Sequence, residues 1–262
     1  MKRRLIDKIP FPLPKEILDI TEGAKIFDSS CSPEARVYYI EKDLGYYLKI
    51  SPKDTLSTEA KMTDYFYKKR LGTEVIEYVS NERDYFVTRR AIGEDATHEK
   101  FLSEPKRLCD FMATRLRSLH ETDFSDCPIQ NRNESYLALA EKNYKAGQFD
   151  LSLTEELFPF KSADYAYSVL CDGKAEFRSD ALLHGDYCLP NVMLTDDFEF
   201  SAFIDLGNGG VGDRHIDIFW GTWTLFFNLK TDKYRARFFD AYGRDSIDEN
   251  MLKIIAAAEI FG

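Results

Sequence analysis

The chain has 262 residues, of which 44% are apolar and 31% are charged, with 14 glycines and 9 prolines. This composition describes a folded chain with a sizeable core and excludes intrinsic disorder, collagen and small disulfide scaffolds. Lysine and arginine total 35 against 45 aspartates and glutamates, which gives a formal charge of −10. We therefore expect no nucleic acid partner and favour a cationic one, although acidic composition also serves solubility alone.

The cysteines and the apolar segments predict a cytoplasmic protein. Five cysteines form no CxxC pair and no metal-ligand spacing, which is typical of reduced thiols. The basic start is followed by prolines at 10, 12 and 14 before any apolar segment long enough for a signal peptide. The most apolar stretch, 254–260, contains Glu259 and is too short to span a bilayer. We expect no membrane partner and a monomer or weak dimer.

The N-terminal third predicts a small β-rich lobe. Segments rich in Tyr, Val and Ile predict strands, and apolar residues at helical spacing from Leu56 to Phe66 predict one helix that ends near Gly72. The expected strands are 24–27, 36–41, 45–50, 73–79 and 83–89. The pattern changes at 91–95, so we assign 1–92 to an N-terminal lobe.

From Ala96 onward the pattern is mostly helical. Pro105 can begin a helix because proline is tolerated in a first turn, and apolar residues from Leu108 to Leu119 mark its buried face. Further helices are expected at 134–146, 161–171, 214–229, 232–242 and 246–260, with a looser segment at 147–160. Strand character returns only at 182–206, as a hairpin of 192–194 and 200–204. The expected fold class is α+β, with a larger, mostly helical C-lobe at 93–262.

The strongest functional signal is His184-Gly-Asp186, followed by Asn191 and, after the predicted hairpin, by Asp205-Leu-Gly207. Kinases use the same order: a catalytic Asp, an Asn for Mg²⁺, and a second Mg²⁺-binding Asp in a D-x-G. A loop that closes on a short hairpin brings its ends together, so Asn191 and Asp205 can bind one Mg²⁺ while Asp186 faces the acceptor hydroxyl. Each piece alone is also typical of a turn or cap, but their order favours a kinase.

A kinase also needs a lysine that contacts the α and β phosphates and a glutamate that orients it. Lys49, in the strand 45–50, and Glu59, in the next helix, fit these two positions. The sequence has no G-x-G-x-x-G, so we expect loop 28–35, with Ser32, to contact phosphate through backbone N–H groups and a hydroxyl. A plain hairpin loop is the alternative there. The absence of A-P-E and H-R-D argues against a protein kinase.

This pattern resembles the bacterial aminoglycoside 3′-phosphotransferases, the kanamycin and neomycin kinases. The resemblance covers nearly the whole chain and is carried by Ser32–Tyr38, Tyr47–Lys49, Leu119–His120, Ser125–Pro128, Phe158–Lys161, His184–Met193, Phe203–Gly207, Gly212–Ile218 and Glu259–Phe261. The H-G-D-x4-N and D-x-G core is shared with choline, macrolide and homoserine kinases, whereas the flanking Cys-Leu-Pro-Asn is more specific. The resemblance implies a protein-kinase-like two-lobed fold, with nucleotide binding in 1–92 and catalysis and substrate binding in 93–262.

The resemblance also implies a role for each matching residue of the 184–217 region. Asp186 would orient or deprotonate a sugar hydroxyl, and Asn191 and Asp205 would bind Mg²⁺. His184 and Asp217 would brace the catalytic loop and are expected to be structural rather than catalytic.

For the nucleotide, the resemblance implies contacts in the N-terminal lobe. Lys49 and Ser32 would contact the phosphates of ATP or GTP. The base would stack on Tyr47 and meet the main chain of Arg89 and Ala91.

Several positions depart from the family pattern on the acceptor side. Asn208 replaces the usual Arg after D-x-G, and Phe227 and Asn228 stand where an acidic pair is common. Gly262 extends the chain beyond the aromatic residue at which relatives tend to end. The remaining candidates for acceptor binding are Glu155, Glu156, Glu259 and Phe261; a solvated surface acid is the alternative for each glutamate.

The expected function is transfer of the γ-phosphoryl group of ATP or GTP to a hydroxyl of a cationic aminoglycoside antibiotic, the 3′-hydroxyl, which would confer resistance. Two alternatives stay open. One is a kinase of the same fold that acts on another small hydroxyl compound, such as a different antibiotic, choline or homoserine. The other is a pseudokinase that binds nucleotide without turnover.

Overall fold

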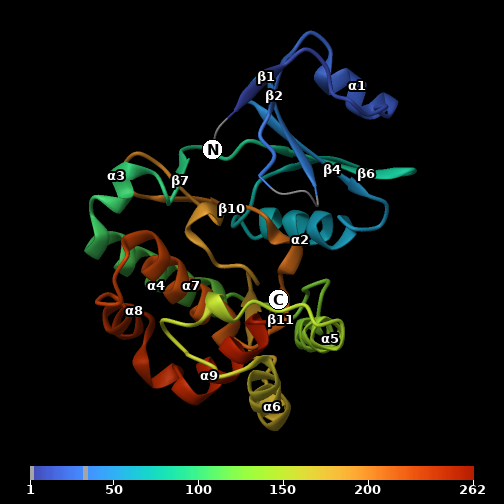
Figure 1. Cartoon of the computed structure of the whole chain (residues 1–262). Coiled ribbons are helices and arrows are strands. Elements are labelled where there is room, and N and C mark those ends of the chain that lie inside the picture. Colours follow the sequence, from blue (N-terminus) through green and yellow to red (C-terminus); the bar gives the residue numbers. More distant parts are fainter. Residues whose placement is uncertain (1–2, 32–34) are drawn as a thin grey trace. The chain divides into compact units, whose positions relative to one another are not determined.

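The computed structural model describes residues 3–31 and 35–262, which form two compact units. The N-terminal unit comprises Met1–Glu94 and Met193–Gly207, and the C-terminal unit comprises Asp95–Val192 and Asn208–Gly262. The first unit is built on a sheet and the second is mostly helical (Figure 1). This combination confirms the expected α+β class, while the division into contiguous lobes 1–92 and 93–262 stays a prediction.

The N-terminal unit contains an antiparallel sheet with the strand order β1-β2-β3-β4-β6-β5. Its elements are β1 (Arg4–Ile6), α1 (Lys15–Thr21), β2 (Lys25–Asp28), β3 (Arg36–Glu41), β4 (Tyr46–Pro52), α2 (Ser57–Lys68), β5 (Val75–Ser80) and β6 (Arg83–Arg89). Every predicted strand of this unit is present within two residues at its ends. The sequence did not predict β1 and α1, because elements of three and seven residues are too short to show a hydrophobic period.

The two faces of the sheet are covered differently, and this decides where Lys49 points. Leu48 of β4 is buried in a cluster that includes Ile17 of α1. On the opposite face, Ala60 of α2 packs against Phe86 of β6, and Figure 1 shows α1 and α2 on opposite sides of the sheet. Side chains alternate along a strand, so Lys49 lies on the face that α2 covers.

The C-terminal unit is a packed set of helices. They are α3 (Glu99–Leu102), α4 (Pro105–His120), α5 (Arg132–Lys145), α6 (Ala163–Gly173), α7 (His215–Leu229), α8 (Arg235–Tyr242) and α9 (Glu249–Glu259). α4 packs on α8, and both α6 and α7 pack on α9. The predicted helices of this unit are present within three residues at their ends. None of the helices formed by the described residues is long and apolar enough to cross a membrane.

Short strands frame the two segments that carry the functional motif. The strands are β7 (Glu94–Asp95), β8 (Ala181–Leu183), β9 (Val192–Leu194), β10 (Phe200–Phe203) and β11 (Gly210–Gly212). β8 pairs with β11, and β9 pairs with β10, which confirms the predicted hairpin. The segment from His184 to Asn191 therefore runs from β8 to β9, and Asp205 follows β10.

Candidate active site

Lys49, Glu59 and Asp205 meet in the N-terminal unit. Nζ of Lys49 donates to both carboxylate oxygens of Glu59, at 2.7 and 2.9 Å, and to Oδ1 of Asp205 at 2.8 Å. Glu59 lies in the first turn of α2 and is buried, whereas about half of the Asp205 side chain is exposed. The predicted Lys49–Glu59 partnership is confirmed as a contact, and Asp205 extends it into a cluster of three charges.

The two carboxylates keep the lysine charged. Burial by itself would lower the pKa of Lys49, but the negative charges of Glu59 and Asp205 outweigh it and raise the pKa to about 12. Burial raises the pKa of Glu59, and the Lys49 ammonium opposes that rise. The cluster thus holds one positive charge in a fixed place, which is what recognition of an anionic group requires.

The position of Glu59 depends on Asp84, a residue that sequence reasoning missed. Asp84 of β6 is fully buried, and its carboxylate accepts the N–H groups of Asp54 at 3.0 Å and of Leu56 at 2.8 Å. Leu56 immediately precedes α2, where backbone N–H groups have no partner inside the helix. Asp84 therefore anchors the turn that carries Glu59. An aspartate next to the apolar run Tyr85–Val87 of β6 was the available signal.

Asp205 has an unusual backbone. Its φ of 60° lies in the left-handed region, which is uncommon for residues with a side chain but is adopted by aspartate more often than by most. The preceding strand is tied to the end of α2, since Phe203 donates its N–H to the Leu71 carbonyl at 2.8 Å. The left-handed turn after this anchor directs the Asp205 carboxylate to Lys49.

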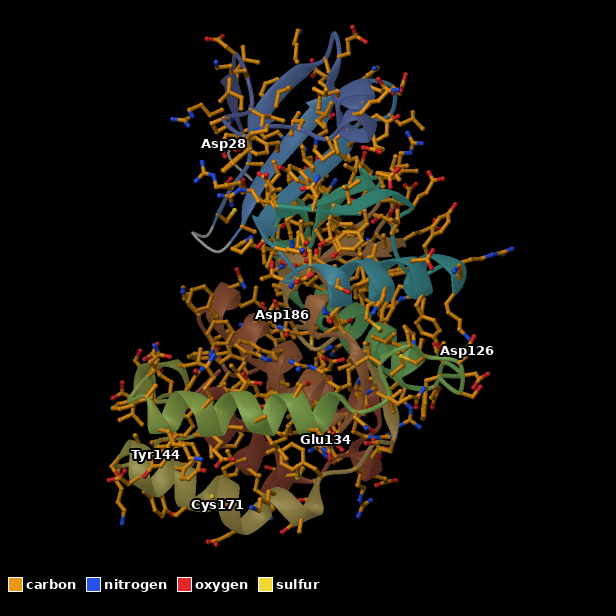
Figure 2. The ribbon with its side chains drawn as sticks, turned by 90° about the vertical axis from the view of Figure 1, so that its right-hand side faces the viewer. Asp28, Asp126, Glu134, Tyr144, Cys171 and Asp186 are labelled. Atoms are coloured by element: carbon orange, nitrogen blue, oxygen red, sulfur yellow. The ribbon has the colours of Figure 1, made fainter. Side chains whose placement is uncertain are left out.

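Asp186 lies in the loop from β8 to β9, in the C-terminal unit (Figure 2). Nδ2 of Asn191 donates to Oδ2 of Asp186 at 2.9 Å and to its carbonyl oxygen at 3.0 Å. Gly185 has a φ of 82°, and a Cβ there would lie 1.9 Å from the Asn208 carbonyl oxygen. Only glycine fits this position, so the glycine of the H-G-D motif is required for the close approach of this loop to Asn208.

A buried aspartate of α7 accepts hydrogen bonds from the backbone of the loop that carries Asp186. Asp217, in the first turn of α7, accepts the N–H groups of His184 and Gly185, each at 2.7 Å. Its Oδ2 also lies 3.3 Å from Nε2 of His120, whose pKa is lowered by burial. Nδ1 of His184 in turn accepts the N–H of Asp186 at 3.3 Å. The predicted bracing of the loop by His184 and Asp217 is confirmed.

The predicted base-reading segment begins at Arg89, the last residue of β6. The N–H of Arg89 donates to the Glu74 carbonyl at 2.9 Å, and the N–H of Arg90 donates to the Gly45 carbonyl at 3.0 Å. Backbone groups alternate in an extended chain, so the Arg89 carbonyl and the Ala91 N–H face away from β4. They lie past the first residue of β5, at an edge of the sheet. Such an edge can hydrogen-bond a planar ligand.

The other two predicted nucleotide contacts are Tyr47 and Ser32. Tyr47 is on β4, on the same face as Lys49, and is partly exposed; its hydroxyl accepts a hydrogen bond of 2.6 Å from Arg3. Its ring lies 5.4 Å from that of Tyr39. Ser32 lies outside the described residues.

Glu259, a predicted acceptor contact, is a buried carboxyl group in the C-terminal unit. Its Oε1 accepts hydrogen bonds from the Tyr136 hydroxyl at 2.8 Å and from Nε1 of Trp220 at 3.0 Å. Burial raises the pKa of Glu259 to about 7, the two hydrogen bonds oppose the rise, and the negative charge of Asp186 adds to it. Sequence reasoning missed Tyr136 and Trp220, because aromatic residues on a helix usually indicate core packing.

The remaining acceptor candidates differ in exposure. Glu155 and Glu156 are exposed, after a short 3-10 helix at Leu151–Leu153. Phe261 is buried and makes edge contacts with the rings of Tyr144, labelled on α5 in Figure 2, and Tyr167 of α6. The glutamates are thus accessible to a ligand, whereas the Phe261 ring packs between α5 and α6.

Known proteins are similar to this chain in sequence. The model of the phosphotransferase enzyme family matches residues 33–252. A Lactococcus lactis protein named "Probable aminoglycoside 3′-phosphotransferase" is 48% identical over 98% of this chain and 96% of its own length. An aminoglycoside 3′-phosphotransferase of Niallia circulans is 29% identical over 92% of this chain and 94% of its own.

Solved structures agree on the fold. The crystal structure of an aminoglycoside 3′-phosphotransferase of type VIII has a TM-score of 0.73 at 22% identity, over 95% of this chain and all of the other. An aminoglycoside phosphotransferase of Streptomyces rimosus, in complex with ADP and streptomycin, has a TM-score of 0.71 at 18% identity, over 86% and 90% of the two chains. The chain therefore belongs to the phosphotransferase enzyme family and, within it, to the kinase-like aminoglycoside 3′-phosphotransferases.

Proposed function

We propose that this protein transfers the γ-phosphoryl group of ATP or GTP to the 3′-hydroxyl of an aminoglycoside antibiotic and thereby confers resistance. The observation that carries the proposal is the 48% identity, over 98% of the chain, to a relative named for this activity. The formal charge of −10 suits a polycationic acceptor. The enzyme acts in the cytoplasm as a monomer or weak dimer, and has no nucleic acid or membrane partner.

The nucleotide is bound by the N-terminal unit. Lys49, oriented by Glu59, contacts the α and β phosphates, and Ser32 contacts phosphate from its loop. The base stacks on Tyr47. The carbonyl of Arg89 and the N–H of Ala91 hydrogen-bond the edge of the base. The charge and orientation of the Lys49 ammonium support this assignment.

Asn191 and Asp205 have the right donor chemistry for Mg²⁺, which prefers hard oxygen ligands and takes only a few of them from protein. The Asn191 NH₂ group is engaged by Asp186, so its amide oxygen is the atom of this side chain available to a metal. Asp205 contributes a partly exposed carboxylate. When bound, Mg²⁺ neutralises charge on the phosphates during transfer.

Asp186 accepts the proton of the acceptor hydroxyl as that oxygen bonds to the γ-phosphorus. The bond from the γ-phosphorus to the oxygen that bridges to the β-phosphate breaks, and the nucleoside diphosphate leaves. Such transfers need positioning and charge neutralisation more than covalent chemistry. The bracing of the loop by Asp217 supplies the positioning.

The predicted acceptor contacts are Glu155, Glu156, Glu259 and Phe261, of which Glu155 and Glu156 are exposed and Glu259 and Phe261 are buried. Exposed carboxylates attract ammonium groups, and this attraction weakens as the salt concentration rises. Asn208 departs from the family pattern, but the structure gives it another contact: Arg132 donates to its carbonyl oxygen at 2.7 Å and to Oδ1 at 3.0 Å.

The test is nucleotide turnover with Mg²⁺ across kanamycin, neomycin, hygromycin, streptomycin, a macrolide, choline and homoserine, with Asp186→Asn as the blank. We expect stimulation by kanamycin or neomycin, and a loss of about 10²–10⁴ in kcat for Asp186→Asn with little change in nucleotide KM. Turnover with another acceptor alone would favour the broader kinase function that Asn208, Phe227 and Asn228 suggest. Absence of turnover despite nucleotide binding would favour a pseudokinase.

A further inference from the structure

Three aromatic side chains form a row on α7 of the C-terminal unit. Trp220, Trp223 and Phe227 are spaced three and four residues apart, so they share one face of the helix. The two indole rings lie 5.4 Å apart, and the Trp223 and Phe227 rings are stacked at 4.9 Å with an angle of 10°. We call these three residues the α7 aromatic row. Its outer member, Phe227, is 50% exposed.

The inner end of the row is joined to the residues that surround Asp186. Nε1 of Trp220 donates to Glu259, the carboxyl group whose pKa responds to the charge of Asp186. One turn along α7, Oγ1 of Thr224 accepts the N–H of Leu189, a residue of the loop between Asp186 and Asn191. The row therefore lies on a helix that contacts the proposed phosphoryl-transfer loop within the same unit.

The middle of the row meets the segment that carries two acceptor candidates. Nε1 of Trp223 donates to the Leu153 carbonyl at 2.8 Å. Glu155 and Glu156 follow Leu153 after one intervening residue, Thr154, and are exposed. Aromatic surface and carboxylates are thus combined at one place, and together they favour a ligand with both apolar and cationic character.

The outer ring already carries an ammonium group. Nζ of Lys230 lies 4.1 Å from the centroid of the Phe227 ring, within the range of a cation–π contact. Lys230 ends α7 with a φ of 54°, in the left-handed region, and is itself exposed. An exposed lysine on an exposed ring is held weakly, so a cationic ligand can replace it.

We propose that the α7 aromatic row is a binding surface for an amino sugar ring of the acceptor, and that the acceptor's ammonium group displaces Lys230 from the Phe227 ring. The sugar ring lies on the outer face of Phe227, opposite the face that stacks on Trp223, while Glu155 and Glu156 attract the ammonium groups around it. This inference rests on the proposed function and names the side chains that select its acceptor. The inference therefore assigns acceptor binding to an aromatic ring at position 227, where the family commonly has an acidic residue.

Steady-state kinetics with kanamycin tests the two halves of the inference. We expect Phe227→Leu, which keeps apolar volume but removes the ring face, to raise the KM for kanamycin about fivefold and to leave the nucleotide KM unchanged. Lys230→Met should lower the kanamycin KM about twofold. Lys233→Met is the matched control, because it removes the same charge from an exposed lysine that lies over Tyr234 rather than Phe227.

A double variant separates occupancy of the ring from simple charge removal. In the Phe227→Leu background, Lys230→Met should change the kanamycin KM no more than Lys233→Met does, because the site of competition is gone. A kanamycin KM within twofold of the parent for both Phe227→Leu and Trp223→Leu would overturn the inference, as would equal effects of the two lysine variants in the parent.

Intrinsic fluorescence distinguishes failure of this inference from failure of the proposed function. The chain has two tryptophans, and both belong to the row. We expect kanamycin to change their emission saturably, with a midpoint about fivefold higher in Phe227→Leu, and neutral maltotriose to change it far less. Saturable binding without phosphorylation would refute the proposed function and retain the row as a binding surface. Phosphorylation with an unchanged midpoint in Phe227→Leu would do the reverse, and absence of both would refute both.

Discussion

Glu259 is a carboxyl group in a place that disfavours its charge. It is 6% exposed, and the negative charge of Asp186 adds to the effect of burial, so its pKa is raised to about 7. A folded-state pKa above the ordinary value of 4.5 means that the folded protein binds a proton more tightly than the unfolded chain. Glu259 therefore contributes stability below about pH 4.5, and this contribution is lost as the pH rises through about 7.

Because the stabilising contribution of Glu259 falls as the pH rises, Glu259→Gln should remove this pH dependence. The glutamine is neutral at every pH and keeps an oxygen for Tyr136 and Trp220. Relative to the variant, the parent should lose about 3 kcal/mol of unfolding free energy between pH 5 and pH 8. Urea unfolding at a series of pH values measures the difference. Glu249→Gln, an exposed change on the same helix, should retain the pH dependence of the parent; parallel curves for the parent and Glu259→Gln would contradict the assignment.

The motif residues were predictable from the sequence because spacing along the chain encodes their contacts. Lys49 and Glu59 were predicted as partners, and Asp186 and Asn191 were predicted to lie on one loop. The partners of Glu259 were not predictable, because Tyr136 and Trp220 come from two other helices and have no fixed spacing to it. The roles of all these residues in binding and transfer stay predictions.

At the scale of elements, the placement of α2 depends on one side chain outside it. Asp84 accepts two N–H groups at the start of the helix and also the hydroxyl groups of Tyr78 and Ser80. Its hydrogen bonds lower its pKa although burial alone would raise it, so the carboxylate is charged. The first turn of α2, which carries Glu59, is thus fixed to the sheet that carries Lys49.

We expect Asp84→Asn to lower the free energy of unfolding by about 1–3 kcal/mol, because an amide cannot accept all of these hydrogen bonds. The nucleotide KM should rise while the acceptor KM stays close to that of the parent, since the damage reaches Lys49 through Glu59. Urea unfolding and kinetics with each substrate varied in turn provide the two readouts. Glu82→Gln, on the adjoining turn, is the control, and an unchanged nucleotide KM in Asp84→Asn would refute the link to Lys49.

Long helices and the short β9–β10 hairpin were predictable from the sequence, whereas the pairing of β8 with β11 was not, for a physical reason. A helix such as α4 shows its buried face over several turns, whereas β8 and β11 have three residues each. Their pairing joins 181–183 to 210–212, and a contact between such distant segments leaves no local period.

At the scale of the whole molecule, the chain passes between its two compact units more than once. Residues Met193–Gly207 belong to the N-terminal unit although they follow most of the C-terminal unit in sequence. The change from strand-like to helical sequence at 91–95 predicts two contiguous lobes. It does not reveal that the chain returns to the N-terminal unit at Met193–Gly207. This return carries Asp205 from the end of the motif to Lys49.

The most direct test of the central claim uses two acceptors that differ by one oxygen. Tobramycin is kanamycin B without the 3′-hydroxyl, so it keeps the ammonium groups and lacks the proposed acceptor atom. We predict Mg²⁺-dependent phosphorylation of kanamycin B, detected as a new phosphate by mass spectrometry and placed at the 3′ carbon by NMR. Tobramycin should inhibit this reaction competitively without being phosphorylated. Equal phosphorylation of both compounds, or of neither, would contradict the account.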